Sequence, residues 1–70
     1  MITLDQIRAR LIEEINNSGM TRKEIATRLG ITPQTISSYA HGKKMPALDT
    51  FANLCKVLDV DPAEILCTNG

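Results

Sequence analysis

The fold of this 70-residue chain is decided by residues 21–42, which read TRKEIATRLGITPQTISSYAHG. Thr21 stands just before a helical pattern of apolar residues, and Glu24 follows three positions later, which is the spacing of a capping box. Gly30 ends that pattern. The Thr-Pro pair at 32–33 begins another, because proline at the first helical position loses no hydrogen bond. The stretch therefore predicts two short helices joined by a tight turn.

Helical spacing also extends to both sides of this stretch. Thr3 with Gln6 predicts a capped first helix, and Asp61 followed by Pro62 predicts the start of a short last helix. The apolar positions that recur every three or four residues on the two longer helices are Leu4, Ile7, Leu11, Ile12 and Ile15, and Leu48, Phe51, Leu54, Cys55 and Leu58. No segment alternates with a period of two for long enough to predict a strand. We therefore expect an all-α fold, a compact five-helix bundle formed as a single domain by residues 1–70.

Composition restricts the classes of function. The chain is 43% apolar and 3% aromatic, so its core is aliphatic. No apolar run approaches the roughly 20 residues of a membrane span, and a signal peptide's apolar stretch is absent, so we expect a cytoplasmic protein with no membrane partner. Cys55 and Cys67 are accordingly expected to be reduced thiols.

Catalysis and metal binding find little support in the residues. Ser37 and His41 lie one helical turn apart but have no orienting acid, so we expect no enzyme. No cofactor is predicted. No metal site is expected either, because His41 and the two cysteines are only three soft ligands and none stands at the close spacing of a structural site.

The formal net charge is zero but unevenly distributed. Residues 22–44 hold five basic side chains against one acidic side chain, a net charge of +4, and the rest of the chain carries −4. A mixed solvated surface would explain these numbers, whereas an acid-poor basic segment also suits a polyanionic partner.

The short connection Gly30-Ile31-Thr32 gives residues 22–41 the shape of a helix-turn-helix. Ala26 lets the two helices cross closely, and Gly30 permits the positive φ that the turn requires. A generic helical hairpin shares these features, so the spacing alone leaves both interpretations open.

With these features the chain resembles the Cro/repressor (XRE-type) helix-turn-helix family. The segments that carry the resemblance are 21–31, 35–39, 42–46 and the apolar stripe at 48–58, and it extends over residues 4–66. The resemblance implies a lambda-repressor-like domain that binds specific DNA sequences and regulates transcription, usually as a repressor. The alternative is a protein-interaction module, such as an adaptor or an antitoxin-like partner, which keeps the fold without binding DNA.

The resemblance also implies which residues contact DNA. At about 100° per residue, the predicted recognition helix 33–41 has one polar side without acids and an opposite side formed by Ile36, Tyr39 and Ala40. The family positions that approach bases or the adjoining backbone correspond to Thr32, Pro33, Gln34, Ser37 and Ser38. Gln34 is the strongest candidate, because a glutamine amide can bond bidentately to adenine. Phosphate contacts are predicted for Arg22, Lys43, Lys44 and His41, although a histidine at that position can instead complement the helix dipole.

The chain departs from the family's pattern in three ways, one of which involves a pair of positions. Pro33 stands where glutamine is common, which removes one base-reading amide. Ala40 stands where a glutamate is common, and Ile15 stands where some relatives carry that glutamate's arginine partner. Ala47 replaces a common capping serine, which predicts a weaker helix start there.

One recognition helix reads only a few base pairs, so we expect a homodimer on a two-fold operator, with the two helices about 34 Å apart. The apolar residues near the C-terminus that are predicted to form the pairing surface are Val57, Val60, Ile65, Leu66 and Cys67.

Overall fold

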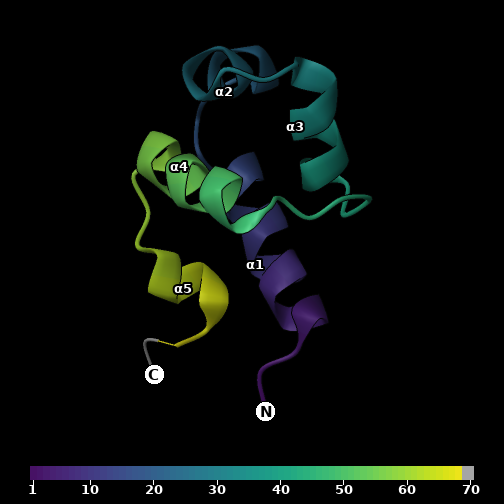
Figure 1. Cartoon of the computed structure of the whole chain (residues 1–70), viewed down its shortest axis with the longest axis vertical. Helices are drawn as coiled ribbons and strands as arrows, with labels where there is room; N and C mark the ends of the chain where they lie inside the picture. Colours follow the sequence, from purple (N-terminus) through teal and green to yellow (C-terminus); the bar gives the residue numbers. More distant parts are fainter. Residues whose placement is uncertain (69–70) are drawn as a thin grey trace.

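The computed structural model describes residues 1–68, and within them the chain forms five helices and no strand. The helices are α1 (Leu4–Asn16), α2 (Arg22–Leu29), α3 (Pro33–Ala40), α4 (Leu48–Leu58) and α5 (Pro62–Leu66). In Figure 1, α2 and α3 lie at one end of the molecule, and α5 lies at the other end with the N-terminus. The predicted all-α, five-helix architecture is confirmed.

The predicted helix starts are present as hydrogen bonds. In the capping box before α2, Glu24 N–H donates to the Thr21 hydroxyl at 3.1 Å, and Thr21 N–H donates back to the Glu24 carboxylate at 3.3 Å. Thr3 and Gln6 form the same kind of capping box before α1, whereas the side chains of Thr32 and Asp61 cap α3 and α5 by accepting one backbone N–H each. Ala47 makes no side-chain cap before α4, as its departure from the family's pattern predicted.

The turn between α2 and α3 depends on a glycine. Gly30 has φ +78°, a left-handed conformation that costs an L-residue energy through its Cβ. This conformation lets Ile31 N–H donate to the Ala26 carbonyl at 3.0 Å, so the end of α2 is closed by backbone bonds. The turn consequently defines the orientation of α3 relative to α2, and the two helices pack directly against each other.

Every helix contributes to one buried cluster. Its members are Leu11, Ile15, Ile25, Ala26, Ile36, Tyr39, Ala40, Phe51, Leu54, Cys55 and Ile65. Ile15 and Ala40, two of the positions that depart from the family's pattern, are 3% and 5% exposed, so apolar packing occupies the place where some relatives have an ion pair. The other main helix contacts join α1 to α3 and α5, and α2 to α4.

Three residues differ from their predicted environments. Leu4 and Leu48 belong to the predicted apolar stripes, yet they are 55% and 86% exposed. Each is the first residue of its helix, where the helix end is not covered by a neighbouring helix. Ile65 was predicted on a pairing surface, and this is wrong, because α5 packs against α1 and leaves Ile65 0% exposed.

Among the other candidates for pairing, Val57, Val60 and Leu66 are half-buried against the core, and Cys67 is also half-buried. Cys55 and Cys67 are free thiols, the first buried and the second half-buried. Across the described residues, none of the helices combines the length and the apolar character that crossing a bilayer requires.

Candidate nucleic-acid interface

Helix α3 lies at the edge of the molecule, with one side in the core and the other in solvent (Figure 1). Ile36 is 0% exposed, and Tyr39 and Ala40 are 7% and 5% exposed, so these three side chains anchor the inner side. This is the division of the helix that the sequence predicted. The residues of the segment that the sequence assigned to DNA contact are exposed or half-buried: Thr32, Pro33, Gln34 and His41 are exposed, and Ser37 and Ser38 are half-buried.

The start of α3 is held by Thr32. Its hydroxyl accepts the Thr35 N–H at 3.3 Å and forms a second hydrogen bond, 3.0 Å long, with the Thr35 hydroxyl. The cap fixes the first turn of the helix, and Pro33 at the first helical position stiffens it further. Gln34, the next residue, therefore extends from a backbone whose direction is defined before any partner binds.

The end of α3 carries the two lysines. Gly42 has φ +74°, and this left-handed turn brings Lys43 N–H to the Ser38 carbonyl at 2.9 Å and Lys44 N–H to the same oxygen at 3.3 Å. Both lysines are exposed. Because these bonds tie their backbone to the last turn of α3, the positions of the two lysines relative to the polar side of that helix are fixed. His41 is the C-cap residue and is exposed beside them.

Arg22 lies at the other end of the helix-turn-helix, as the first residue of α2. Its guanidinium donates to the Asn16 carboxamide oxygen at 3.4 Å, across the link between α1 and α2. Asn16 was not singled out from the sequence, because this bond joins two helices whose relative placement is set by the core. The nearest signal was the polar run of residues 16–18, which begins at the last residue of α1.

The charge asymmetry of the sequence becomes an asymmetry in space. The basic residues of the 22–44 segment are all exposed, on α2 and in the turn after α3: Arg22, Lys23, Arg28, Lys43 and Lys44. Three exposed acids lie farther along the chain: Asp59 ends α4, Asp61 caps α5 and Glu64 lies within α5, the helix at the opposite end of the molecule from α2 and α3 (Figure 1). Phosphates are therefore favoured beside α2 and the turn after α3, and disfavoured beside the acids of the α4–α5 link and α5.

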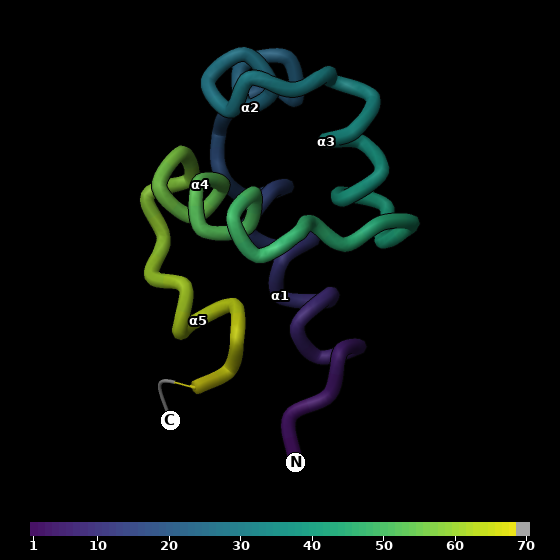
Figure 2. The backbone as a smooth tube through the Cα atoms, in the orientation of Figure 1, coloured from purple at the N-terminus to yellow at the C-terminus, as the bar shows by residue number. Residues whose placement is uncertain are grey.

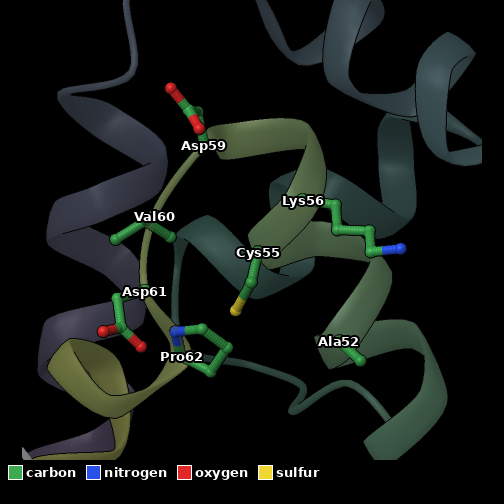
Figure 3. A pocket seen from close by; sticks show the side chains of 7 residues that line it. All are labelled: Ala52, Cys55, Lys56, Asp59, Val60, Asp61 and Pro62. Carbon is green, nitrogen blue, oxygen red and sulfur yellow. The ribbon is translucent and has the colours of Figure 1, made fainter.

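A hollow between α4 and the start of α5 provides a contrast with this surface. It is lined by Ala52, Cys55, Lys56, Asp59, Val60, Asp61 and Pro62, and Figure 3 shows the Cys55 sulfur pointing into it. Burial, with a smaller contribution from the Asp61 carboxylate, raises the pKa of the Cys55 thiol. The thiol is therefore protonated at neutral pH, and two carboxylates against one ammonium make the hollow a poor anion site.

Comparison with known proteins agrees with this geometry. Residues 11–65 match the profile of the helix-turn-helix family, a match that includes α2, α3 and α4 entirely. No curated protein and no solved structure matches the chain at a significant level.

Proposed function

Because the chain belongs to the Cro/C1-type (XRE) helix-turn-helix family, we propose that it binds specific double-stranded DNA sequences through α3 and represses transcription. The observation that carries the proposal is the acid-free exposed side of α3, with basic side chains at both ends of the helix-turn-helix. Helices of this kind enter the major groove, where base edges present a distinct pattern for each base pair. A cytoplasmic location, as expected from the sequence, is part of this proposal.

In this proposal the start of α3 reads the bases. Gln34 is exposed, and its amide can donate to adenine N7 and accept from adenine N6 only when the helix is seated in the groove. Pro33 offers an apolar surface for a thymine methyl group. Ser37 and Ser38, half-buried on the same helix, supply hydroxyls that accept or donate and therefore discriminate less. Thr32 is the N-cap residue of the same helix, and its hydroxyl is already engaged in the cap.

The backbone of the DNA is held from both ends of the motif. Arg22 approaches the phosphates from the start of α2, where the helix N-terminus also favours an anion. Lys43 and Lys44 approach them from the turn after α3, and His41 lies beside these lysines. Phosphate contacts of this type set the register of the protein and carry no sequence information.

Sequence-specific binding at one site in a genome requires two such helices. We therefore propose a homodimer on a two-fold operator, paired through the half-buried residues Val57, Val60 and Leu66 at the α4–α5 end. Ile65 is excluded from that surface by its burial. This surface belongs to α4 and α5, whereas the proposed base and phosphate contacts belong to α2, α3 and the turn after α3, so pairing leaves the proposed DNA surface free.

The proposal is tested by selecting bound sequences from a random duplex pool at several salt concentrations. Enrichment of a two-fold site, with affinity that falls steeply as salt rises, is the expected result. A promoter reporter that contains the enriched site then distinguishes repression from activation. Absence of duplex binding at low salt would contradict the proposal and favour a protein-interaction module with this fold.

Point variants assign the contacts. Gln34→Ala is expected to weaken operator binding by about 5- to 150-fold, which corresponds to about 1–3 kcal/mol, and to leave non-specific duplex binding unchanged. Asn53→Ala, at an exposed position of α4, is its control. Lys44→Glu is expected to weaken binding to all duplexes, whereas Lys56→Glu makes the same charge change beside the α4–α5 hollow and is expected to have a smaller effect.

A further inference from the structure

Arg8 belongs to α1, outside the helix-turn-helix, yet its side chain lies against the turn that ends α3. A Cβ placed on Gly42 would lie 3.1 Å from Arg8 Cδ and 3.6 Å from Arg8 Cγ. The aliphatic stem of Arg8 therefore covers the backbone of Gly42, the residue between His41 and Lys43. Figure 2 shows the loop that follows α3 crossing over α1 on its way to α4.

The two ends of the Arg8 side chain have different environments. Its Nε is buried and has no hydrogen-bond partner within the described residues, so the inner part of the group is enclosed by protein. Its outer Nη1 donates to the Asp5 carboxylate at 2.7 Å. The Arg8 side chain is 32% exposed and that of Asp5 is 89% exposed, which places this ion pair at the surface.

We infer that Arg8 is a further phosphate-contacting residue, supplied by α1, and that Asp5 holds its guanidinium until a DNA phosphate replaces the carboxylate. The inference rests on the proposed function, since it extends the row of phosphate contacts from Lys43 and Lys44 onto the neighbouring helix. It also gives Asp5 a role in the free protein, because the carboxylate keeps the guanidinium extended beside the turn.

The exchange is favourable in chemical terms. An ion pair between exposed side chains contributes little to stability, because water screens it and two long side chains must be ordered. A guanidinium can instead bind a phosphate through two parallel N–H bonds, which are charge-assisted. The Asp5 carboxylate is still stabilised after Arg8 leaves it, because Asp5 lies in the first turn of α1, at the positive end of that helix's dipole.

A purely structural role for Arg8, in which the stem only supports the Gly42 turn, predicts different behaviour. Arg8→Met keeps an unbranched stem of similar length over Gly42 and removes the charge. Arg10→Met removes the same charge from the same helix, at an exposed position two residues away and therefore about 200° around the axis. Arg8→Lys keeps the charge and loses the planar fork. Far-UV circular dichroism and urea unfolding establish that each variant is folded.

The measurement is the slope of the logarithm of duplex affinity against the logarithm of salt concentration. We expect Arg8→Met to reduce the magnitude of this slope by about 0.9, the value for one phosphate contact. If Arg8→Met and the wild type bind equally at 1 M salt, this difference in slope makes the affinity of Arg8→Met about eightfold lower at 0.1 M salt. Arg10→Met is expected to change the slope much less, and Arg8→Lys to retain most of it.

Asp5→Asn supplies the complementary test. Removing the competing carboxylate is expected to raise duplex affinity, and by more than Glu13→Gln, which makes the same charge change at an exposed position farther along α1. Equal slopes for Arg8→Met and Arg10→Met would overturn the inference while leaving the proposed function intact. A wild-type protein that binds no duplex would overturn both.

Discussion

Replacing Gly42 by alanine will separate the cost of a left-handed backbone from the cost of crowding. Gly19, Gly30 and Gly42 share nearly the same φ, +77°, +78° and +74°, so a Cβ imposes a similar backbone cost of about 1 kcal/mol at each. Their surroundings differ. A Cβ on Gly19 or Gly30 meets nothing within 4 Å, whereas a Cβ on Gly42 lies 3.1 Å from Arg8 Cδ and 3.2 Å from Ile12 Cδ1.

Crowding in a packed site costs about 1–3 kcal/mol, and the partly exposed Arg8 can move, so we expect the low end of that range at Gly42. Gly42→Ala should therefore lower the free energy of unfolding by about 2 kcal/mol, against about 1 kcal/mol for Gly30→Ala and Gly19→Ala. In a domain of this size each kcal/mol lowers Tm by about 4–8 °C. Urea unfolding followed by far-UV circular dichroism measures all three variants against the wild type.

The same experiment contains its own check. In an Arg8→Ala background the nearest obstacle is gone, so Gly42→Ala should cost less there than in the wild type, and the two substitutions should be coupled. If the three glycine variants lose the same free energy of unfolding, or if the double variant shows no coupling, then Arg8 does not pack against Gly42 and the reasoning is refuted.

Three further predictions concern the core and α4. Leu54→Ala removes a side chain that is 0% exposed and should cost about 2–5 kcal/mol, measured by urea unfolding; a loss below that range would contradict its central place in the core. Ala47→Ser should stabilise the protein by about 0.5–1 kcal/mol, because the backbone at Ala47 already has the extended N-cap conformation without a side-chain acceptor, and an unchanged Tm would refute this. Burial, and to a smaller extent Asp61, raises the pKa of the Cys55 thiol, so the unfolded chain releases its proton at lower pH than the folded protein. The contribution of the Cys55 thiol to the free energy of unfolding is therefore complete at neutral pH and falls as pH rises above about 8.5. Urea unfolding measured across that pH range should show a shallower fall for Cys55→Ala than for the wild type.

Much of the fold and of the candidate interface could be predicted from local sequence. The capping boxes and the Thr32 cap are bonds between residues three positions apart, so the residue types and their spacing already define the helix starts. The turn at Gly30 is equally local, since only the backbone of its own loop requires the positive φ. For the same reason the polar and apolar sides of α3 followed directly from its helical period.

The failures occurred where a prediction depended on which helix covers which. Leu4 and Leu48 continue their apolar stripes in sequence, yet the helices packed against α1 and α4 do not reach those ends. Ile65 was assigned to a pairing surface because it is an apolar residue near the C-terminus, but α5 packs against α1 and Ile65 lies in the core. A stripe shows which face of a helix is apolar, not how far along that face a neighbour extends.

Helix boundaries, the helix-turn-helix and the composition of the polar side of α3 were determined by the sequence itself, because they depend on contacts within three or four residues and on helical period. Only the tertiary structure decided that α1 takes part in the turn after α3, through the stem of Arg8 on Gly42, and that Asn16 meets Arg22. Those contacts exist because burial of the common core orients α1 against the helix-turn-helix, and no local pattern records the relative orientation of two helices.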